Sequence, residues 1–346
     1  MHLHALATAV PPATFTQSQC WDVLAESSAR PRLNRRSQLT LKAILGGDSG
    51  IATRHFASTP VERIFDLTPD ELNETFRREG PALGGRALTA ALARAGLRPE
   101  EIDVLIVCTC TGYLCPGVTS YLAEQLGLRD NVFLQDLVGL GCGAAIPALR
   151  AVEAALAARP GATVACVAVE ICSAAFYLDD DIGVLVSACL FSDGAAATLW
   201  RSTPGPTGLR VHGFNTLHVP AERDKLRFEL RDGKLRNRLD PTVPKLAAGA
   251  VARLLAGEPA ALPPVRRIIA HPGGRDVLDA LEAALPGHAL DASRRVLRDY
   301  GNMSSPSVLF ALEEALREKQ PARGEDWWLV SFGAGFSAHS CRLSAD

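Results

Sequence analysis

The sequence predicts an α/β protein in which helices cover mixed β-sheets. Apolar runs typical of buried strands alternate with Ala- and Leu-rich runs typical of helices. Residues 187–200 and 327–343 each have the pattern of a strand, a glycine turn and a second strand. Because each follows a helix-rich stretch, we expect two halves of similar topology, residues 1–205 and 206–346, with the boundary in the Pro- and Gly-rich segment 201–209.

The individual elements follow in chain order. The apolar N-terminus predicts a strand that ends at a Pro-Pro turn. It is not expected to be a signal peptide, because it lacks a basic start and a cleavage site. Strand-like and helix-like runs then alternate, in the order strand, helix, strand, helix, strand, over residues 101–112, 118–128, 131–139, 142–158 and 161–171. Residues 223–244 are rich in charge and contain an Asp-Gly turn, which predicts an inserted hairpin or loop of the kind that often covers a site.

Composition excludes several classes of function. The chain has 346 residues, 47% of them hydrophobic, which is enough for a sizeable core. Its formal net charge is -2 and its basic residues form no stripe, so we expect no binding to nucleic acid or to an anionic membrane surface. No apolar run is long enough to span a bilayer, so we expect a cytoplasmic protein without a membrane span.

The cysteines favour a reducing compartment. There are nine, an odd number, in a long chain without an export signal, so a disulfide framework is not expected. Cys108, Cys110 and Cys115 are close in sequence, but no second Cys pair or His-rich group completes a metal site. We therefore expect no bound metal.

Cys142 is a candidate nucleophile. An apolar run ends at Gly139, Gly141 and Gly143, and a helix of good helix formers follows at once. The glycines permit a tight turn that leaves the thiol accessible, and the helix start favours the thiolate. The alternative is a buried cysteine whose neighbouring glycines serve packing alone.

Two further polar residues have comparable settings. His271 ends a buried strand and precedes a Pro-Gly-Gly turn, at the end of an α/β strand where ligands usually bind. Asn302 follows Gly301 and precedes a serine-capped helix. Taken alone, His271 is as well explained as a histidine on the rim, and Asn302 as a helix cap. Together, a thiol, an imidazole and a carboxamide provide the groups for acyl transfer with stabilisation of an oxyanion.

At these residues the sequence resembles a known family. The strings GCGAA around Cys142, IIAHPGG around His271 and YGNMSSPSVLF around Asn302 are similar to those of type III polyketide synthases, the chalcone synthase group. The strings CTCTGYLCPG, ACLFSDGAAA and SFGAGFSAH extend the resemblance over most of the chain from about Lys42. CTCTGY is most similar to bacterial members that take long acyl chains and make alkylpyrones or alkylresorcinols.

The resemblance implies a five-layered αβαβα thiolase fold, a homodimer, and no metal or organic cofactor. The substrates would be an acyl-CoA starter and malonyl-CoA, with an acyl carrier protein as a possible alternative donor. Cys142 would hold the starter acyl group, and His271 and Asn302 would stabilise the enolate formed from malonyl-CoA. An imidazolium next to the sulfur would lower the pKa of the thiol. We expect an aliphatic starter and two or three extensions.

The resemblance also assigns substrate-binding positions. Phe191 matches a gatekeeper between the CoA tunnel and the cavity, and Ser304 matches a serine that lines the cavity. Gly333 and Gly335 match a glycine loop, with Ala334 in place of the family's proline. Cys115 stands where a residue often reaches into the partner subunit. The remaining cavity positions are Cys110, Thr111, Glu170, Cys172 and Ala175.

The chain departs from the family pattern at two places. Of three basic residues that contact CoA in the plant enzymes only Lys42 is present, and Leu45 and Ser49 occupy the other positions. CoA binding would then depend on another cation, Arg54 or Arg275, or be weaker. Cys172 and Ala175 replace threonines that are common in the chalcone-forming enzymes, which implies a wider apolar pocket or tunnel. The hairpin region 223–244 leaves the second gatekeeper aromatic unplaced.

Other functions remain to be weighed. A ketoacyl-ACP synthase III would share the three polar residues and the fold, but usually lacks YGNMSS. A papain-like hydrolase also has Cys, His and Asn in this order, but its characteristic cysteine segment and its disulfides are missing here. A non-catalytic thiolase-fold partner would have no need to keep all three polar residues.

Overall fold

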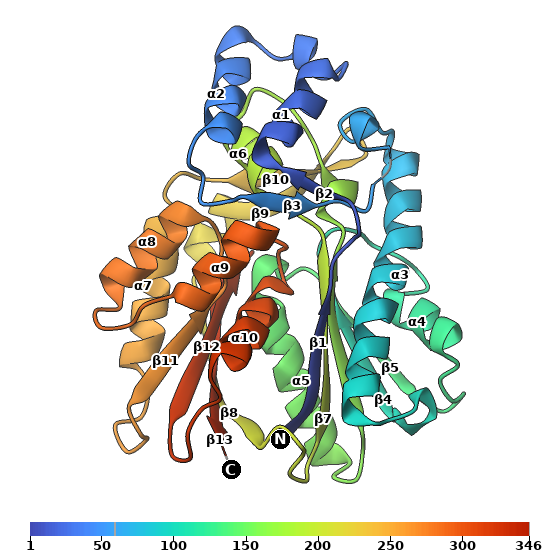
Figure 1. Cartoon of the computed structure of the whole chain (residues 1–346), viewed down its shortest axis with the longest axis vertical. Coiled ribbons are helices and arrows are strands. Elements are labelled where there is room, and N and C mark those ends of the chain that lie inside the picture. The colour runs from blue at the N-terminus through green and yellow to red at the C-terminus, as the bar shows by residue number, and fades with distance from the viewer. Residues whose placement is uncertain (59, 346) are drawn as a thin grey trace.

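The computed structural model describes residues 1–58 and 60–345. Its main sheet has nine strands in the order β11-β12-β13-β8-β1-β7-β6-β4-β5. The strands are β1 (His2–Ala9), β4 (Val104–Cys108), β5 (Phe133–Leu137), β6 (Val164–Glu170), β7 (Gly194–Arg201), β8 (Leu209–His218), β11 (Val265–Ala270), β12 (Asp326–Gly333) and β13 (Ser337–Ala345). Both chain ends lie at the same end of the molecule (Figure 1).

The sheet consists of two parts with the same pattern of strand directions. In the first part β7 runs antiparallel to β1 and to β6, and β4 is parallel to β6. In the second part β13 runs antiparallel to β8 and to β12, and β11 is parallel to β12. A short pairing between β1 and β8 joins the two parts. This repetition confirms the expected halves of similar topology, and the boundary at residues 205 and 206, which stays a prediction, falls between β7 and β8.

Helices complete five layers (Figure 1). α5 (Ala145–Ala158) and α10 (Ser307–Glu318) lie between the two parts of the sheet and share one apolar core with both. α3 (Pro69–Ala95) and α4 (Val118–Leu126) cover the outer face of the first part. α7 (Val243–Ala256) and α8 (Arg275–Ala284) cover the outer face of the second, with α9 (Asp291–Tyr300) next to them. This is the expected αβαβα order.

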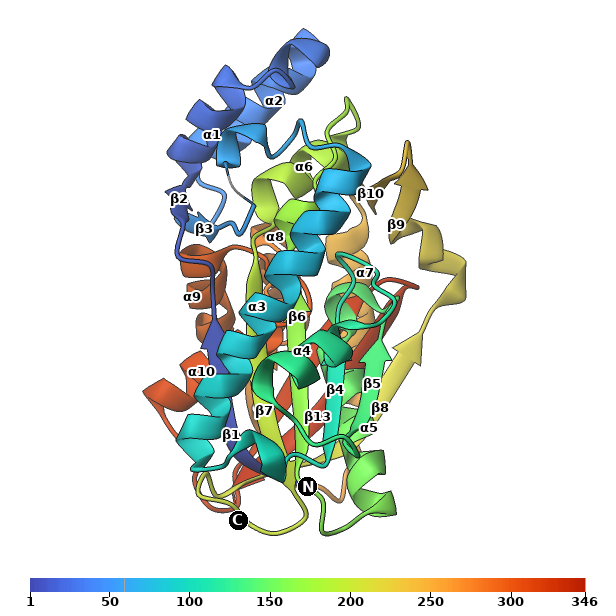
Figure 2. The same ribbon diagram turned by 90° about the vertical axis from the view of Figure 1, so that its right-hand side faces the viewer.

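A cap of smaller elements covers one end of these layers. It contains α1 (Gln17–Glu26), α2 (Arg35–Gly46), α6 (Ile182–Leu190), and two small sheets formed by β2 (Thr14–Thr16) with β3 (Thr53–His55) and by β9 (Leu226–Arg231) with β10 (Lys234–Leu239). The pair β9–β10 is the hairpin expected in residues 223–244, and it stands at the same end as α1 and α2 (Figure 2). The cap has its own apolar core.

One expected element is wrong. Residues 187–190 are the last turn of helix α6 and not a strand. The side chain of Asp181 caps this helix by accepting from the backbone N–H groups of Gly183 and Val184. Because α6 is apolar on almost every side, its sequence lacks the polar face that distinguishes a helix from a buried strand.

None of the helices in the described part of the chain is both long enough and apolar enough to cross a membrane.

Candidate active site

The expected catalytic residues meet at the carboxyl ends of the parallel strands. Cys142 follows β5, His271 follows β11, and Asn302 precedes α10. All three line one cavity of about 640 Å³, which opens between α2, α6, the end of β10 and the start of α8. The sequence did not show directly that these three residues lie close together. They do so because the strands of both parts of the sheet end at the same cavity.

Cys142 lies in a 3₁₀ turn, Gly141–Gly143, directly before α5. Gly141 has a φ of 57°, in the left-handed region that glycine adopts without strain. A Cβ on Gly333, at the end of β12, would lie 2.4 Å from the backbone nitrogen of Gly143 and 2.5 Å from the oxygen of Leu140. The cysteine turn therefore rests directly on the backbone of the other half of the molecule.

Burial opposes the ionisation expected for Cys142 and His271. It raises the pKa of the Cys142 thiol to about 12, although a hydrogen bond with Ser304 opposes this shift. Burial also lowers the pKa of His271 to about 3. Both shifts favour the neutral form, more firmly for the buried His271 than for Cys142, which keeps some exposure at the cavity.

His271 is held by the end of its strand. Its backbone N–H donates to the oxygen of Val330 at 2.8 Å, and its ring packs edge-on against Phe332 with centroids 5.3 Å apart. The ring Nδ1 is buried and has no hydrogen-bond partner among the described residues. The imidazole is thus fixed by packing and not by a hydrogen bond from its Nδ1.

Asn302 is not the helix cap that its sequence setting suggested. Helix α10 begins at Ser307 after Pro306, without a side-chain cap. The Oδ1 of Asn302 instead accepts from the backbone N–H of Ser304 at 2.8 Å, and its Nδ2 donates to the oxygen of Gly273 at 3.2 Å. These bonds fix the amide, and the second N–H of Nδ2 remains available as a donor at the cavity.

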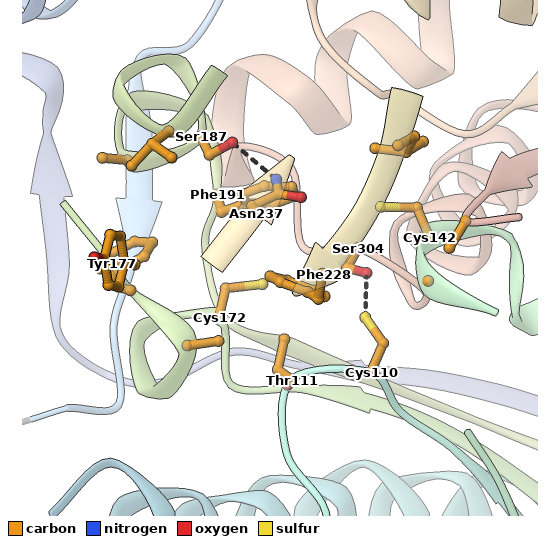
Figure 3. A pocket seen from close by; sticks show the side chains of 17 residues that line it. Cys110, Thr111, Cys142, Cys172, Tyr177, Ser187, Phe191, Phe228, Asn237 and Ser304 are labelled. Atoms are coloured by element: carbon orange, nitrogen blue, oxygen red, sulfur yellow. Dashed lines mark hydrogen bonds between the residues drawn. The ribbon is translucent and has the colours of Figure 1, made fainter. Parts of the chain in front are cut away.

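A second, smaller cavity of about 40 Å³ adjoins the first (Figure 3). Cys142 and Phe191 line both cavities, as expected for a nucleophile and a gate. The small cavity also contains the side chains predicted for it, namely Cys110, Thr111, Cys172, Ala175 and Ser304. The Sγ of Cys110 lies 3.3 Å from the Oγ of Ser304.

The walls of the small cavity are almost entirely apolar, as expected. Besides the small residues Cys172 and Ala175, four aromatic residues line this space. These are Phe176, Tyr177, Phe191 and Phe228. The greater width expected from the small residues stays a prediction.

Phe228 is an aromatic residue of the 223–244 region, where the sequence left the second gatekeeper unplaced. It lies on β9 of the hairpin and lines the small cavity (Figure 3). Asn237 on β10 lies beside it and donates from Nδ2 to the Oγ of Ser187 at 2.8 Å. The alternation in the segment LRFELR is a strand signal, but it does not indicate which cavity the strand covers.

Glu170 lies beneath the cavity and does not line it. Its carboxylate is fully buried and accepts hydrogen bonds from the backbone N–H groups of Cys110 and Thr111 at 2.9 and 3.1 Å. The hydroxyl of Ser305 donates to it at 2.5 Å. Burial raises the pKa of Glu170, and these bonds oppose the shift. The residue holds the 109–111 loop against the turn before α10.

The other glycine of the predicted loop has a backbone role. Gly335 has a φ of 114°, and its oxygen accepts from the Nε2 of His218. Ala334, between the two glycines, lines the small cavity. The loop therefore shapes the cavity wall as expected.

The three cations proposed to bind CoA differ in their exposure and in whether they line the large cavity. Lys42 is exposed, with its Nζ 5.9 Å from the ring centroid of Trp21, and does not line the large cavity. Arg54 is 2% exposed, so its suggested contact with CoA is wrong. Arg275 lines the large cavity and is about half-exposed. Cys115 is exposed, and its expected contact with a partner subunit stays a prediction.

No group of three or more His, Cys, Asp or Glu residues suited to a metal ion occurs in residues 1–58 and 60–345.

Substitution of Gly333 tests the contact that holds the Cys142 turn. In Gly333→Ala the new Cβ would collide with backbone, so we expect a loss of about 1–3 kcal/mol in the free energy of unfolding and slower alkylation of Cys142 by iodoacetamide. Gly249→Ala is the matched control, because a Cβ there has no atom within 4 Å and Gly249 lies inside helix α7. Denaturant titration and alkylation kinetics measure both effects. Wild-type values for Gly333→Ala would contradict the proposed contact.

Two family models match the chain. One, described as FAE1/Type III polyketide synthase-like protein, matches residues 18–207, and the other, Chalcone and stilbene synthases, C-terminal domain, matches residues 219–344. A 1,3,6,8-tetrahydroxynaphthalene synthase of Streptomyces peucetius subsp. caesius is 32% identical over 96% of this chain and 90% of its own. A 3,5-dihydroxyphenylacetyl-CoA synthase of Streptomyces toyocaensis is 32% identical over 83% of this chain and 78% of its own.

Solved structures agree with these matches. The crystal structure of 1,3,6,8-tetrahydroxynaphthalene synthase from Streptomyces coelicolor A3(2), a bacterial type III polyketide synthase, superposes with a TM-score of 0.87 at 26% identity, covering 100% of this chain and 99% of the other. PKS-I from the brown alga Ectocarpus siliculosus has the same fold, with a TM-score of 0.88 at 23% identity over 100% and 99% of the two chains. The chain belongs to the type III polyketide synthases, acyltransferases of the thiolase fold that condense malonyl-CoA onto an acyl starter by Claisen chemistry.

Proposed function

We propose that Cys142 is the nucleophile of this synthase and that His271 and Asn302 stabilise the enolate of malonyl-CoA. One observation carries this proposal. A thiol, an imidazole and a carboxamide, supplied by three distant segments, line the same cavity. Both the imidazole and the amide retain hydrogen-bonding capacity at that cavity, so they are suited to an oxygen on which negative charge develops.

The reaction then takes place in three steps. The sulfur of Cys142 attacks the carbonyl carbon of the starter thioester, and the CoA thiolate leaves. In malonyl-CoA the bond to the carboxylate breaks, CO₂ leaves, and the electron pair enters an enolate whose oxygen accepts from Asn302 and His271. The enolate carbon attacks the acyl carbon on Cys142, and the cysteine thiolate leaves as the extended chain forms.

His271 has a second proposed role in starter loading. Since burial keeps both the thiol and the imidazole neutral, the thiol needs a base when the starter arrives. His271 takes the proton as the sulfur attacks, and the resulting imidazolium and the thiolate stabilise each other. No metal or organic cofactor is needed for these steps.

We propose an aliphatic acyl-CoA starter. The small cavity behind Phe191 has almost entirely apolar walls, which favour a hydrocarbon chain over a polar one. Its volume of about 40 Å³ favours a short chain. The product would be a pyrone or resorcinol ring.

Mass spectrometry of the intact protein with a series of acyl-CoA starters tests the nucleophile and the starter together. Short aliphatic starters should leave an acyl adduct on the wild type and none on Cys142→Ala, and malonyl-CoA should convert the adduct into released polyketides. Cys20→Ala is the control, because Cys20 lies on α1 and lines neither cavity. An acyl adduct on Cys142→Ala would contradict the assignment of Cys142 as the nucleophile. A preference for 4-coumaroyl-CoA would contradict the aliphatic starter. Products of a single condensation would favour a reaction of the ketoacyl-ACP synthase III type.

The pH dependence of thiol alkylation tests His271. In His271→Ala the proposed base for the thiol proton is absent, while burial still disfavours the thiolate. We expect alkylation at pH 7 to be slower than in the wild type by about 100-fold, with a rate that keeps rising above pH 10. His212→Ala is the control, since His212 is half-buried and lies at β8, outside both cavities. Superimposable profiles for His271→Ala and wild type would exclude His271 as the base.

We also propose a homodimer in which Cys115 lies near the cavity of the partner subunit. Cys115 and its neighbour Tyr113 are exposed, as is Phe133 on the edge strand β5. One chain has a mass of 36.8 kDa, and light scattering should give twice this mass. A bifunctional thiol reagent should link the subunits through Cys115. A monomer, or a dimer not linked through Cys115, would contradict this arrangement. We propose CoA as the carrier of the substrates, with an acyl carrier protein as the alternative. The nine free cysteines are consistent with a cytoplasmic location.

A further inference from the structure

Arg54 is a buried cation without an anionic partner. Its side chain is 2% exposed, and its hydrogen bonds in the described part of the chain go to backbone oxygens and not to a carboxylate. Its Nε has no hydrogen-bond partner, and the guanidinium carbon lies 5.0 Å from the ring centroid of Phe56. A charge in such a place is costly unless other groups compensate for it. Neutral dipoles must therefore offset the free-energy cost of burying the positive charge of the guanidinium.

The compensation comes from the end of helix α6. Nη1 of Arg54 donates to the oxygen of Ala188 at 2.7 Å and to the oxygen of Phe191 at 3.1 Å. Ala188 is in the last turn of the helix, and Phe191 is its C-cap. Carbonyl groups at a helix C-terminus lack partners within the helix and carry the negative end of its dipole. Arg54 thus fixes the backbone of the gate residue, Phe191.

The same stretch of backbone holds Asn302. The N–H of Asn302 donates to the oxygen of Leu190 at 3.1 Å, and the N–H of Ser192 donates to the oxygen of Asn302 at 2.9 Å. Phe191 and Asn302 form a parallel bridge through these bonds. A Cβ on Gly301 would lie 3.1 Å from the Cγ of Arg54, so the Arg54 side chain packs directly beneath the Asn302 turn.

Strand β3, which carries Arg54, binds both segments on either side of it. The N–H of His55 donates to the Oγ of Ser192 at 2.7 Å, and the N–H of Asp193 donates to the oxygen of His55 at 2.9 Å. On the other side, the Oγ1 of Thr53 donates to the oxygen of Asp299 at 2.6 Å. The strand therefore lies between the gate segment and the segment that leads to Asn302, with Arg54 in the middle.

We propose that Arg54 is a positioning residue that sets the place of the Asn302 amide relative to the Phe191 gate. The proposal rests on the proposed role of Asn302 in enolate stabilisation. Cys142 is held by other elements, the turn before α5 and the end of β12. Loss of Arg54 should therefore impair the decarboxylation of malonyl-CoA and leave the reactivity of the thiol unchanged.

The test compares these two activities in Arg54→Met, which keeps an unbranched side chain and removes the donors. We expect the rate of CO₂ release from malonyl-CoA to fall by about 10- to 100-fold, because a small displacement of a donor is enough for such a loss. The rate and pH profile of Cys142 alkylation should stay within about twofold of wild type, as expected for a site whose geometry is intact. Arg129→Met is the control, because Arg129 donates to the backbone oxygen of Ile102, pairs with Asp103 and does not line the cavity.

Asn302→Ala separates failure of this proposal from failure of the proposed function. If Asn302→Ala releases CO₂ at the wild-type rate, the role of Asn302 is wrong. If Asn302→Ala is impaired and Arg54→Met is not, or if Arg54→Met loses decarboxylation and alkylation in parallel, the positioning role of Arg54 is wrong. If Arg54→Met fails to fold, Arg54→Lys and Ser192→Ala take its place. Arg54→Lys keeps the positive charge. Ser192→Ala removes the hydrogen bond that the backbone N–H of His55 donates to the Oγ of Ser192. Each should lose decarboxylation selectively and less severely, and wild-type rates in both would overturn the proposal.

Discussion

The contact between the end of β12 and the turn that carries Cys142 is the constraint on which the site depends. Gly333 belongs to the second half of the chain and the turn belongs to the first, yet their backbones are so close that no Cβ fits between them. α5, which starts at this turn, packs with α10 in the core shared by both parts of the sheet. Close packing in that core therefore determines where the thiol lies.

Burial gives the site its electrostatic character. The imidazole is buried and the thiol is partly exposed at the cavity, and burial shifts the pKa of each toward the neutral form. The carboxylate of Glu170 accepts from backbone N–H groups and from side-chain hydroxyls, and backbone groups fix the amide of Asn302. Donors that are fixed in this way are in place for the charge that appears during the reaction.

The sequence predicted the alternation of elements, the two similar halves and the residues that meet at the cavity. Glycines beside Cys142, His271 and Asn302 were informative because the turns they form are local properties of the chain. The width of the pocket could not be predicted, because Phe176, Tyr177 and Phe228 line it from distant segments. Arg54 was misjudged for a similar reason, since a lone arginine in a sequence does not show that it is buried against a helix end. The effect of burial on the pKa of the thiol could not be predicted either, because burial depends on residues that are distant in the sequence.

The central claim is that Asn302 and His271 stabilise the enolate independently of the nucleophile. CO₂ release from malonyl-CoA by Cys142→Ala tests it most directly, because this variant keeps both donors and cannot hold an acyl chain. The account predicts that Cys142→Ala continues to decarboxylate malonyl-CoA while forming no polyketide. Loss of CO₂ release in Cys142→Ala, with the fold intact, would show that the two donors do not act on malonyl-CoA in the way the structure implies.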